Sequence, residues 1–169
     1  MDTAIIKKYV EIGVRGGNTL SRVLNKYNTI EIAYAIDPYA SYLDWCGFVN
    51  QEELNLAKKE AYKKINDMGM ISKVNFIEKK SKDVAHLFED ESIDLLYIDG
   101  DHSLEGALCD FLLYYSKVKK DFYFGGHDYS LEGVNSALKI FCEIKNLSFD
   151  NDIIKSDFPY HNSWYITKK

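Results

Sequence analysis

The sequence predicts a doubly wound α/β fold, in which helices cover both faces of a mostly parallel sheet. Three observations lead to this prediction. Short apolar runs alternate with helical patterns along most of the 169 residues. The run 93–98 is apolar at nearly every position, as expected for a parallel strand that is buried on both faces. The last two apolar runs, 153–154 and 164–167, are joined by too few residues for a crossover helix, so we expect an antiparallel hairpin there.

The apolar runs give about seven strands, and we expect a Rossmann-like, seven-stranded sheet with a C-terminal antiparallel hairpin. Each run is short and is followed by turn residues or by a helical pattern. The expected strands cover residues 8–14, 30–36, 74–78, 93–98, 121–124, 153–154 and 164–167.

Apolar residues at helical spacing predict helices between these strands. Asn18 or Thr19 can cap the first helix and Ser103 a later one, because a short side-chain oxygen accepts hydrogen bonds from free backbone N–H groups. The expected helices extend from residue 18 or 19 to 27, over 51–68, over a short turn at 83–88, from 104 to 115 and from 131 to 141. We expect inward-facing side chains at Val84, Leu87 and Phe88 of the short turn and at Leu104, Leu108, Phe111, Leu112 and Tyr115 of the helix after Ser103.

Composition limits the class of protein. A chain of 169 residues fits one domain, and its 46% hydrophobic and 28% charged residues are ordinary for a soluble globular protein. The net charge of −5 argues against nucleic-acid binding, since a basic face supplies most of that affinity. The three cysteines, Cys46, Cys109 and Cys142, form no Cys-x-x-Cys pair, which suits a reducing compartment and excludes a structural zinc knuckle. No apolar run reaches the length of a membrane span and no signal-peptide pattern opens the chain, so we expect a cytoplasmic protein without a membrane partner.

Polar and glycine residues follow four of the predicted strands at the point where each strand ends. In open α/β sheets, ligands bind at the carboxyl ends of the strands. We therefore expect these groups to converge on one edge of the sheet and to form the ligand site. They are the segments 11–19, 37–38, 99–102 and 125–128.

The glycine-rich turn after the first strand predicts a ligand that contains adenosine. Glycines between a strand and a helix permit a tight turn and let a ligand approach the backbone closely. Asp37 follows Gly13 by 24 residues, near the spacing of about 20 at which an acid meets ribose hydroxyls. The alternative is that the glycines only form a turn and that Asp37 only begins a helix.

Two residues argue against a dinucleotide. A diphosphate site needs a second glycine where this chain has Arg15, whose side chain would crowd the phosphates. Glu11 places a negative charge near the same position, which repels phosphates and suits a ligand with an ammonium group and a sulfonium. The phosphate-binding loop of nucleotide triphosphatases is also absent from the sequence.

Three motifs resemble those of a known family. Val10 to Thr19 is similar to the first motif of class I S-adenosylmethionine-dependent methyltransferases. The segments 98–103 and 125–129 resemble later motifs of one branch of that class, which includes O-methyltransferases acting on sugars and related small molecules. The resemblance spans nearly the whole chain, so a single methyltransferase domain over residues 1–169 is expected.

The resemblance implies roles for the matching positions. Glu11 and Gly13 would border the methionine part of S-adenosylmethionine, Asp37 would accept the ribose hydroxyls, and Asp99 would lie beside the sulfonium and the acceptor. Residues 80–83 would lie near the adenine, although a glycine–acid pair is commoner there. The predicted cofactor-binding residues are Glu11, Gly13, Arg15, Gly17, Asn18, Thr19, Asp37, Pro38, Ser81 and Asp99.

Methyl transfer requires that the acceptor be aligned with the methyl group and lose a proton. The candidate catalytic residues are Asp99, Asp101, His102 and His127. Alternatively, Asp99, His127 and Asp128 bind a divalent metal, Mg²⁺ or Mn²⁺, that acidifies a hydroxyl pair. The imidazole at 127 makes Mg²⁺ the poorer of the two candidates, because Mg²⁺ prefers oxygen ligands. The segments 101–103 and 127–128 can instead cap the helices that follow them.

The segment after Asp37 carries aromatic residues at a spacing of three, Tyr39, Tyr42, Trp45 and Phe48, which fits one helical stripe. Core packing is the expected role, and a lid over the cofactor or acceptor is the alternative. Because the chain begins almost directly at the first strand, we expect an acceptor site that is open or is completed by a second subunit in a homo-oligomer.

Three functions are consistent with the sequence. The first is S-adenosylmethionine-dependent methylation of a hydroxyl on a small molecule, such as a sugar or glycan precursor. The second is an NAD-dependent oxidoreductase on a Rossmann-type sheet, which Arg15 and Glu11 disfavour. The third is a non-catalytic module that binds an adenosyl ligand, against which Asp99 and the glycine turn argue.

Overall fold

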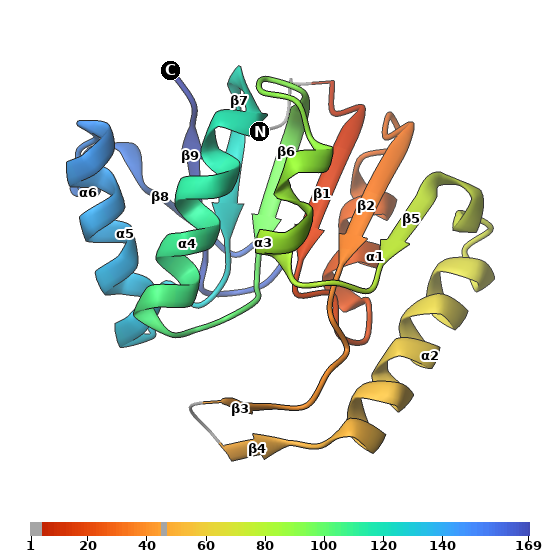
Figure 1. Ribbon diagram of the computed structural model, residues 1–169. Coiled ribbons are helices and arrows are strands. Elements are labelled where there is room, and N and C mark those ends of the chain that lie inside the picture. The colour runs from red at the N-terminus through yellow and green to blue at the C-terminus, as the bar shows by residue number, and fades with distance from the viewer. Residues whose placement is uncertain (1–4, 45–46) are drawn as a thin grey trace.

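A computed structural model describes residues 5–44 and 47–169 and contains one seven-stranded sheet, as predicted (Figure 1). The strand order is β5-β2-β1-β6-β7-β9-β8. The pairs from β5 to β7 are parallel, whereas β9 pairs antiparallel with both β7 and β8, which confirms the C-terminal hairpin. The strands are β1 Lys8–Ile12, β2 Ile32–Ile36, β5 Val74–Ile77, β6 Ile93–Ile98, β7 Val118–Gly126, β8 Ile154–Ser156 and β9 Ser163–Thr167.

Helices connect the strands on both faces of the sheet (Figure 1). Three short 3₁₀ turns, Ile71–Lys73, Ala85–Leu87 and Tyr115–Lys117, lie between them. The α-helices are α1 Asn18–Lys26, α2 Gln51–Asp67, α3 Ser81–Val84, α4 Leu104–Tyr114, α5 Glu132–Lys145 and α6 Phe149–Asp152. None of the helices in the described ranges combines the length and the apolar character needed to cross a membrane.

Alternating residues of the central strands contribute to two cores, because successive side chains of a strand point to opposite faces. Val10 packs with α4 and α5 residues such as Phe111 and Leu138. Tyr9 packs on the other face with α1 and α2 residues such as Val23 and Ile65. Every residue of β6 is buried, which confirms the prediction from its apolar run.

Several local predictions are wrong. Neither Asn18 nor Thr19 caps α1, because the N-cap residue is Gly17, which has a left-handed backbone conformation. Leu87 is 57% exposed and Leu112 is 40% exposed, so neither faces the core as predicted. The first strand ends at Ile12 rather than at residue 14, because Gly13 turns the chain at a φ of 84°.

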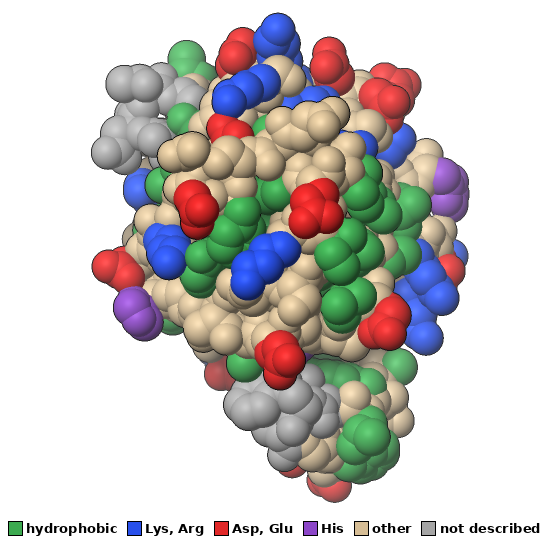
Figure 2. Space-filling view, turned by 90° about the vertical axis from the view of Figure 1, so that its left-hand side faces the viewer, with side chains coloured by type: hydrophobic (Ala, Val, Ile, Leu, Met, Phe, Trp, Pro, Cys, Tyr) green, Lys and Arg blue, Asp and Glu red, His purple; other side chains and the backbone are tan. Residues whose placement is uncertain are grey.

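The aromatic segment after Asp37 is not helical. Tyr42–Asp44 and Gly47–Val49 form a two-stranded antiparallel hairpin, β3 and β4, that extends beyond the carboxyl edge of the main sheet (Figure 1). Tyr39 is buried, but Phe48 is 66% exposed, so these side chains do not share one packed stripe. In Figure 2 this hairpin is part of the projection below the main body, and hydrophobic side chains gather there. Trp45 and Cys46, two residues of the earlier predictions, lie outside the described residues.

Two glycines allow the elements at the carboxyl edge to approach one another. A Cβ atom on Gly13 would lie 1.8 Å from the carbonyl oxygen of Asp99, at the end of β6. A Cβ atom on Gly17 would lie 3.1 Å from Cα of Ala61, where α1 begins against α2. Both glycines also have positive φ angles, which other residues rarely adopt.

We predict that Gly13→Ala lowers the free energy of unfolding by ~3 kcal/mol or more, because strain at positive φ adds to a collision with the Asp99 backbone. The matched control is Gly69→Ala, since Gly69 has a φ of 68° but open space around its Cβ position. This control should cost only about 1–2 kcal/mol. Urea denaturation of both variants measures the difference, and equal losses would contradict the close approach at Gly13.

Candidate functional site at the carboxyl edge of the sheet

The carboxyl ends of the central strands meet at one edge, as predicted. Ile12 pairs with Ile36 of β2 and with Ile98 of β6, and Ile98 pairs with Gly126 of β7. The residues that follow these four ends are therefore neighbours in space, although they are far apart in the sequence. This edge holds Asp37, Asp99, His127 and Asp128 together with the glycine turn.

The carboxylate of Asp37 joins the end of β2 to the glycine turn. Its Oδ2 atom accepts a hydrogen bond of 2.8 Å from the backbone N–H of Arg15, and its Oδ1 atom accepts one of 2.8 Å from Tyr39. Burial raises the pKa of Asp37, although these backbone donors oppose the shift. Each carboxylate oxygen can accept a second hydrogen bond. Asp37 can therefore bind a pair of hydroxyl groups without leaving the turn.

Arg15 contributes to the site through its backbone. Its side chain is exposed, and its φ of 44° is a conformation that glycine adopts more easily. Its carbonyl oxygen accepts a hydrogen bond of 3.0 Å from the Tyr39 hydroxyl. The chain thus keeps a glycine-like turn at this position with a charged side chain directed to solvent.

Lys64 of α2 binds the remaining part of the glycine turn. The sequence did not suggest this contact. Its ammonium group donates to the carbonyl oxygen of Gly16 at 2.8 Å and to the side-chain oxygen of Asn18.

Thr19 is buried in the first turn of α1, and Pro38 is exposed at the end of β2. The predicted cofactor residues of segments 11–19 and 37–38 therefore lie together at this edge.

Glu11 is a fully buried acid with an unsatisfied oxygen. Its Oε2 atom accepts a hydrogen bond from the Tyr9 hydroxyl, but its Oε1 atom has no partner among the described residues. Burial raises the pKa of Glu11 well above its ordinary value, and the nearby charges of Asp99 and Asp37 add to this shift. A buried oxygen without a partner is costly. A ligand that brings a positive charge or a hydrogen-bond donor would relieve that cost.

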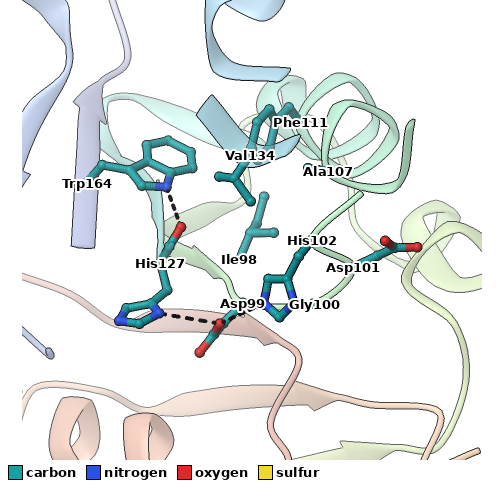
Figure 3. A pocket seen from close by; sticks show the side chains of 10 residues that line it. All are labelled: Ile98, Asp99, Gly100, Asp101, His102, Ala107, Phe111, His127, Val134 and Trp164. Atoms are coloured by element: carbon teal, nitrogen blue, oxygen red, sulfur yellow. Dashed lines mark hydrogen bonds and ion pairs between the residues drawn. The ribbon is translucent and has the colours of Figure 1, made fainter. Parts of the chain in front are cut away.

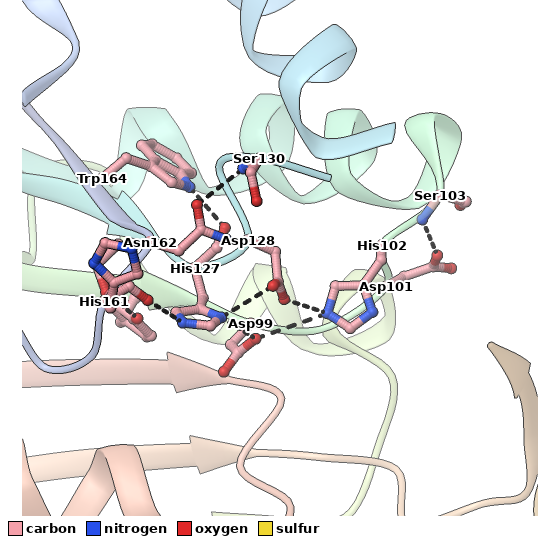
Figure 4. A network of polar contacts seen from close by, with 12 residues as sticks. Asp99, Asp101, His102, Ser103, His127, Asp128, Ser130, His161, Asn162 and Trp164 are labelled. Atoms are coloured by element: carbon pink, nitrogen blue, oxygen red, sulfur yellow. Dashed lines mark hydrogen bonds and ion pairs between the residues drawn. The ribbon is translucent and has the colours of Figure 1, made fainter. Parts of the chain in front are cut away.

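Two histidines and two aspartates form a polar network next to the turn (Figure 4). Asp128 contacts both imidazoles, with its Oδ2 atom 2.9 Å from His102 Nε2 and its Oδ1 atom 3.2 Å from His127 Nδ1. Asp99 Oδ1 lies 3.8 Å from each of the same two nitrogen atoms. A distance of 3.8 Å is too long for a hydrogen bond. A small polar group that enters beside Asp99 can therefore contact the carboxylate and both imidazoles.

The network shifts the pKa values of its members. Burial would raise the pKa of Asp128, but hydrogen bonds from His102 and His127 and their charges outweigh it and place the pKa well below its usual range. The hydrogen bond to Asp128 raises the pKa of His127, and the charges of Asp99 and Asp128 contribute to the shift. The site therefore favours a positive charge between the carboxylates.

The alternative role for segments 101–103 and 127–128, helix capping, is found in the first segment but not in the second. Helix α5 has Leu131 as its N-cap residue without a side-chain hydrogen bond, so His127 and Asp128 do not cap it. Ser103 does cap α4, by accepting a hydrogen bond of 3.1 Å from Gly106. Asp101 accepts one of 2.9 Å from the backbone N–H of Ser103 and points away from the network (Figure 4).

A small pocket adjoins the network beneath α4. His102 and His127 both line it, and Trp164 donates a hydrogen bond of 3.0 Å to the carbonyl oxygen of His127 (Figure 3). The apolar part of its wall consists of Ile98, Ala107, Phe111, Val134 and Trp164. The polar network thus borders an apolar wall on one side.

Three residues of the network could bind a metal ion, and one of them differs from the predicted set. Single ligand atoms of Asp99, His102 and Asp128 all lie within 4.8 Å of one another. The prediction named His127 in place of His102, and His127 Nδ1 also faces Asp128. Two carboxylates with an imidazole suit Mn²⁺ or Zn²⁺ better than Mg²⁺.

Ser81, a predicted cofactor residue, lies outside the polar network and forms other hydrogen bonds. Its hydroxyl donates a hydrogen bond of 2.5 Å to Asp110 Oδ1, and its carbonyl oxygen accepts one of 2.8 Å from the Tyr114 hydroxyl. Burial raises the pKa of Asp110 to about 6. Asp110 was not among the predicted site residues, although it lies on the buried side of α4 with Ala107, Phe111 and Tyr114 at helical spacing.

Comparisons with known proteins agree with this geometry. A family model described as a methyltransferase domain matches residues 10–129. The chain is 36% identical over 126 residues to an uncharacterized protein of Acanthamoeba polyphaga mimivirus, which covers 72% of this chain and 51% of that protein. The chain thus spans about half the length of this curated relative.

Similar folds occur in several solved structures. The O-methyltransferase NovP has a TM-score of 0.72 at 17% identity, over 98% of this chain and 73% of that chain. The O-methyltransferase TomG from Streptomyces achromogenes, solved with S-adenosylmethionine, has a TM-score of 0.68 at 10% identity, over 98% and 74% of the two chains. Spermidine synthase from Thermotoga maritima has a TM-score of 0.61 at 15% identity, over 98% and 55%. At these identities the likeness shows the fold alone.

The buried carboxyl group of Asp110 predicts a pH-dependent stability. Its pKa is about 6 in the folded chain, against an ordinary value of 3.8, so the folded state retains the proton longer than the unfolded state. The wild-type protein should therefore lose stability from this group as the pH rises from about 4 to 6. An Asp110→Asn variant does not titrate there, so its stability relative to wild type should rise by about 3 kcal/mol over this range.

Urea denaturation of both proteins between about pH 4 and 7 measures this difference. Asp150→Asn removes an exposed carboxylate and is the matched control. A flat difference for Asp110→Asn would show that the Asp110 carboxyl group titrates alike in both states.

Proposed function

The chain belongs to the methyltransferase-domain family, and from that premise we propose that it transfers the methyl group of S-adenosylmethionine to a hydroxyl group of a small molecule. A sugar or a glycan precursor is the proposed class of acceptor. The observation that supports the proposal most strongly is the convergence of three acids, Glu11, Asp37 and Asp99, around one glycine turn at the carboxyl edge of the sheet.

The acids fit the cofactor by charge and by hydrogen bonding. Asp37 has remaining acceptor capacity for ribose hydroxyls, because the hydrogen bonds from Arg15 and Tyr39 use one site on each oxygen. Glu11 has a buried unsatisfied oxygen beside the same turn. The cofactor carries a sulfonium and an ammonium group, whose positive charges would favour the ionised form of these acids and offset the effect of burial on the pKa of Glu11. Carboxylates at this turn would repel a diphosphate, which disfavours an NAD-dependent oxidoreductase.

The network supplies the groups that align and deprotonate an acceptor. We infer that a hydroxyl oxygen binds beside Asp99, at hydrogen-bonding distance from the carboxylate and from an imidazole of His102 or His127. The carboxylate of Asp128 orients both imidazoles and stabilises whichever one takes the proton. The apolar wall of the adjoining pocket, which includes Phe111 and Trp164, limits the access of water on that side.

We also propose that the network can bind a divalent metal, with Mn²⁺ a better fit than Mg²⁺. Asp99, Asp128 and an imidazole of His102 or His127 would supply the ligands. When bound, the ion would lower the pKa of a coordinated hydroxyl group. Activity that rises with Mn²⁺ and falls with a chelator would support this site.

We predict that Asp37→Asn weakens the binding of S-adenosylhomocysteine, the cofactor product, by about tenfold or more, because the amide nitrogen cannot accept a hydrogen bond. Calorimetric titration measures the change, and a thermal melt verifies that the variant is folded. Asp150→Asn makes the same chemical change at an exposed position of α6 and should bind as wild type does. Equal affinities in all three proteins would contradict a ribose site at Asp37.

We predict that Asp99→Asn keeps its affinity for S-adenosylhomocysteine within about threefold but transfers methyl groups about a hundredfold more slowly or worse. The assay follows S-adenosylhomocysteine release with a panel of small sugars and catechols, with Mn²⁺ or a chelator present. Asp101→Asn is the matched control two residues away, and it should retain nearly normal rates because Asp101 points away from the network.

Two outcomes would contradict parts of the proposal. A folded Asp99→Asn variant with a normal rate would exclude Asp99 from the reaction. Binding of S-adenosylhomocysteine without transfer to any acceptor would favour a non-catalytic module that binds an adenosyl ligand.

A further inference from the structure

Three hydrogen bonds connect Arg15, Asp37 and Tyr39 in a closed cycle, which we call the Asp37 cycle. The backbone N–H groups of Arg15 and Tyr39 donate to the two oxygens of the Asp37 carboxylate, each at 2.8 Å. The Tyr39 hydroxyl closes the cycle by donating to the carbonyl oxygen of Arg15 at 3.0 Å. Tyr39 therefore binds the carboxylate through its backbone and the glycine turn through its side chain.

Two residues of the Asp37 cycle have strained backbones. Arg15 and Tyr39 both have a φ of 44°, which residues other than glycine rarely adopt. Such a conformation costs on the order of 1–3 kcal/mol and persists only where the surrounding structure fixes it. At both positions the N–H group points to the same carboxylate. The strain thus coincides with the placement of the Asp37 side chain.

Gln51, the first residue of α2, also binds Tyr39. Its Nε2 atom donates a hydrogen bond of 2.7 Å to the carbonyl oxygen of Tyr39, and its Oε1 atom accepts one of 3.2 Å from the backbone N–H of Ser41. Tyr39 and Ser41 precede the β3–β4 hairpin, and Gln51 follows it (Figure 1). These contacts therefore close the base of the hairpin and join it to the Asp37 cycle.

The Tyr39 hydroxyl is a stable donor in this position. The residue is only 5% exposed, and burial together with the negative charge of Asp37 raises the pKa of the hydroxyl above its ordinary value. The hydroxyl is therefore protonated near neutral pH. Its hydrogen bond to the carbonyl oxygen of Arg15 persists under the conditions in which a ligand binds.

We propose that Tyr39 is a positioning residue for the cofactor, which closes the Asp37 cycle and so keeps the Asp37 carboxylate oriented toward the ribose hydroxyls. Tyr39 acts through Asp37 and Arg15, and Gln51 holds Tyr39 in place. The inference rests on the proposed function, in which the ribose binds at Asp37. It adds that recognition of the ribose depends on a side chain outside the glycine turn.

The test compares the affinities of S-adenosylhomocysteine and of its analogue without the ribose 2′-hydroxyl group, by calorimetric titration. We expect wild type to prefer S-adenosylhomocysteine by about tenfold or more, as for a hydrogen bond to a charged group. In Tyr39→Phe the affinity for S-adenosylhomocysteine should fall by about fivefold, while that for the analogue stays within about twofold of wild type. A general loss of structure would weaken both ligands alike.

Matched variants separate the Asp37 cycle from the loss of any buried hydroxyl. Tyr165 is also buried, and its hydroxyl donates a hydrogen bond of 3.0 Å to a carbonyl oxygen, that of Phe158. Tyr165→Phe should therefore keep the preference of wild type. Gln51→Ala removes the contact with the Tyr39 carbonyl at an exposed position and should reduce the preference by about twofold or more. This variant decides the question if Tyr39→Phe does not fold.

Kinetics give a second readout. Tyr39→Phe should raise KM for the cofactor, while kcat at saturating cofactor stays near that of wild type, because the variant leaves the polar network intact.

An unchanged preference in Tyr39→Phe, or in Gln51→Ala if Tyr39→Phe does not fold, would overturn this inference and leave the proposed function standing. Failure of wild type to bind S-adenosylhomocysteine would overturn both.

Discussion

The contact between Gly13 and the backbone of Asp99 is the constraint on which the rest of the site depends. It lets β1 and β6 end side by side, so that the glycine turn and the polar network share one edge of the sheet. The backbone N–H of Asp99 also bonds to the carbonyl oxygen of Ile12 at 2.8 Å. Any side chain at position 13 would separate the two strand ends and move Asp99 away from the turn.

Once these ends meet, the charges at the edge determine which ligand fits. Glu11, Asp37 and Asp99 place three carboxyl groups around the turn, and Glu11 is buried with an unsatisfied oxygen. Burying like charges together is unfavourable unless a cation or a donor balances them. The arrangement is therefore understandable as a site for a positively charged ligand with a vicinal diol. The histidines beside Asp99 and Asp128 extend the site toward an acceptor.

The sequence was sufficient to predict the succession of strands along the chain, the mostly parallel sheet with its C-terminal hairpin, and the residues at the carboxyl edge. These predictions depend on local signals: apolar runs of strand length, and polar or glycine residues immediately after them. The β3–β4 hairpin was mispredicted because a spacing of three among Tyr39, Tyr42, Trp45 and Phe48 is compatible with a helix, and no burial is visible in a sequence.

Other features that the sequence did not predict depend on contacts between residues that are far apart along the chain. Tyr39 and Arg15 are 24 positions apart, and Lys64 and Gly16 are 48 positions apart, so no local pattern links them. Asp110 had a local signal, since it is a carboxylate within the apolar stripe of α4, but its partner Ser81 is 29 positions away. The helix start at Gly17 was missed because Asn18 and Thr19 are both good capping residues by type.

The most direct test of the account is a crystal structure of the protein grown with S-adenosylhomocysteine. We expect the ligand at the carboxyl edge of the sheet, with both ribose hydroxyls on the Asp37 carboxylate, the amino acid part beside Glu11 and Gly13, and the sulfur atom facing Asp99. A ligand bound elsewhere, or bound at this edge with its ribose away from Asp37, would contradict the assignment of the site.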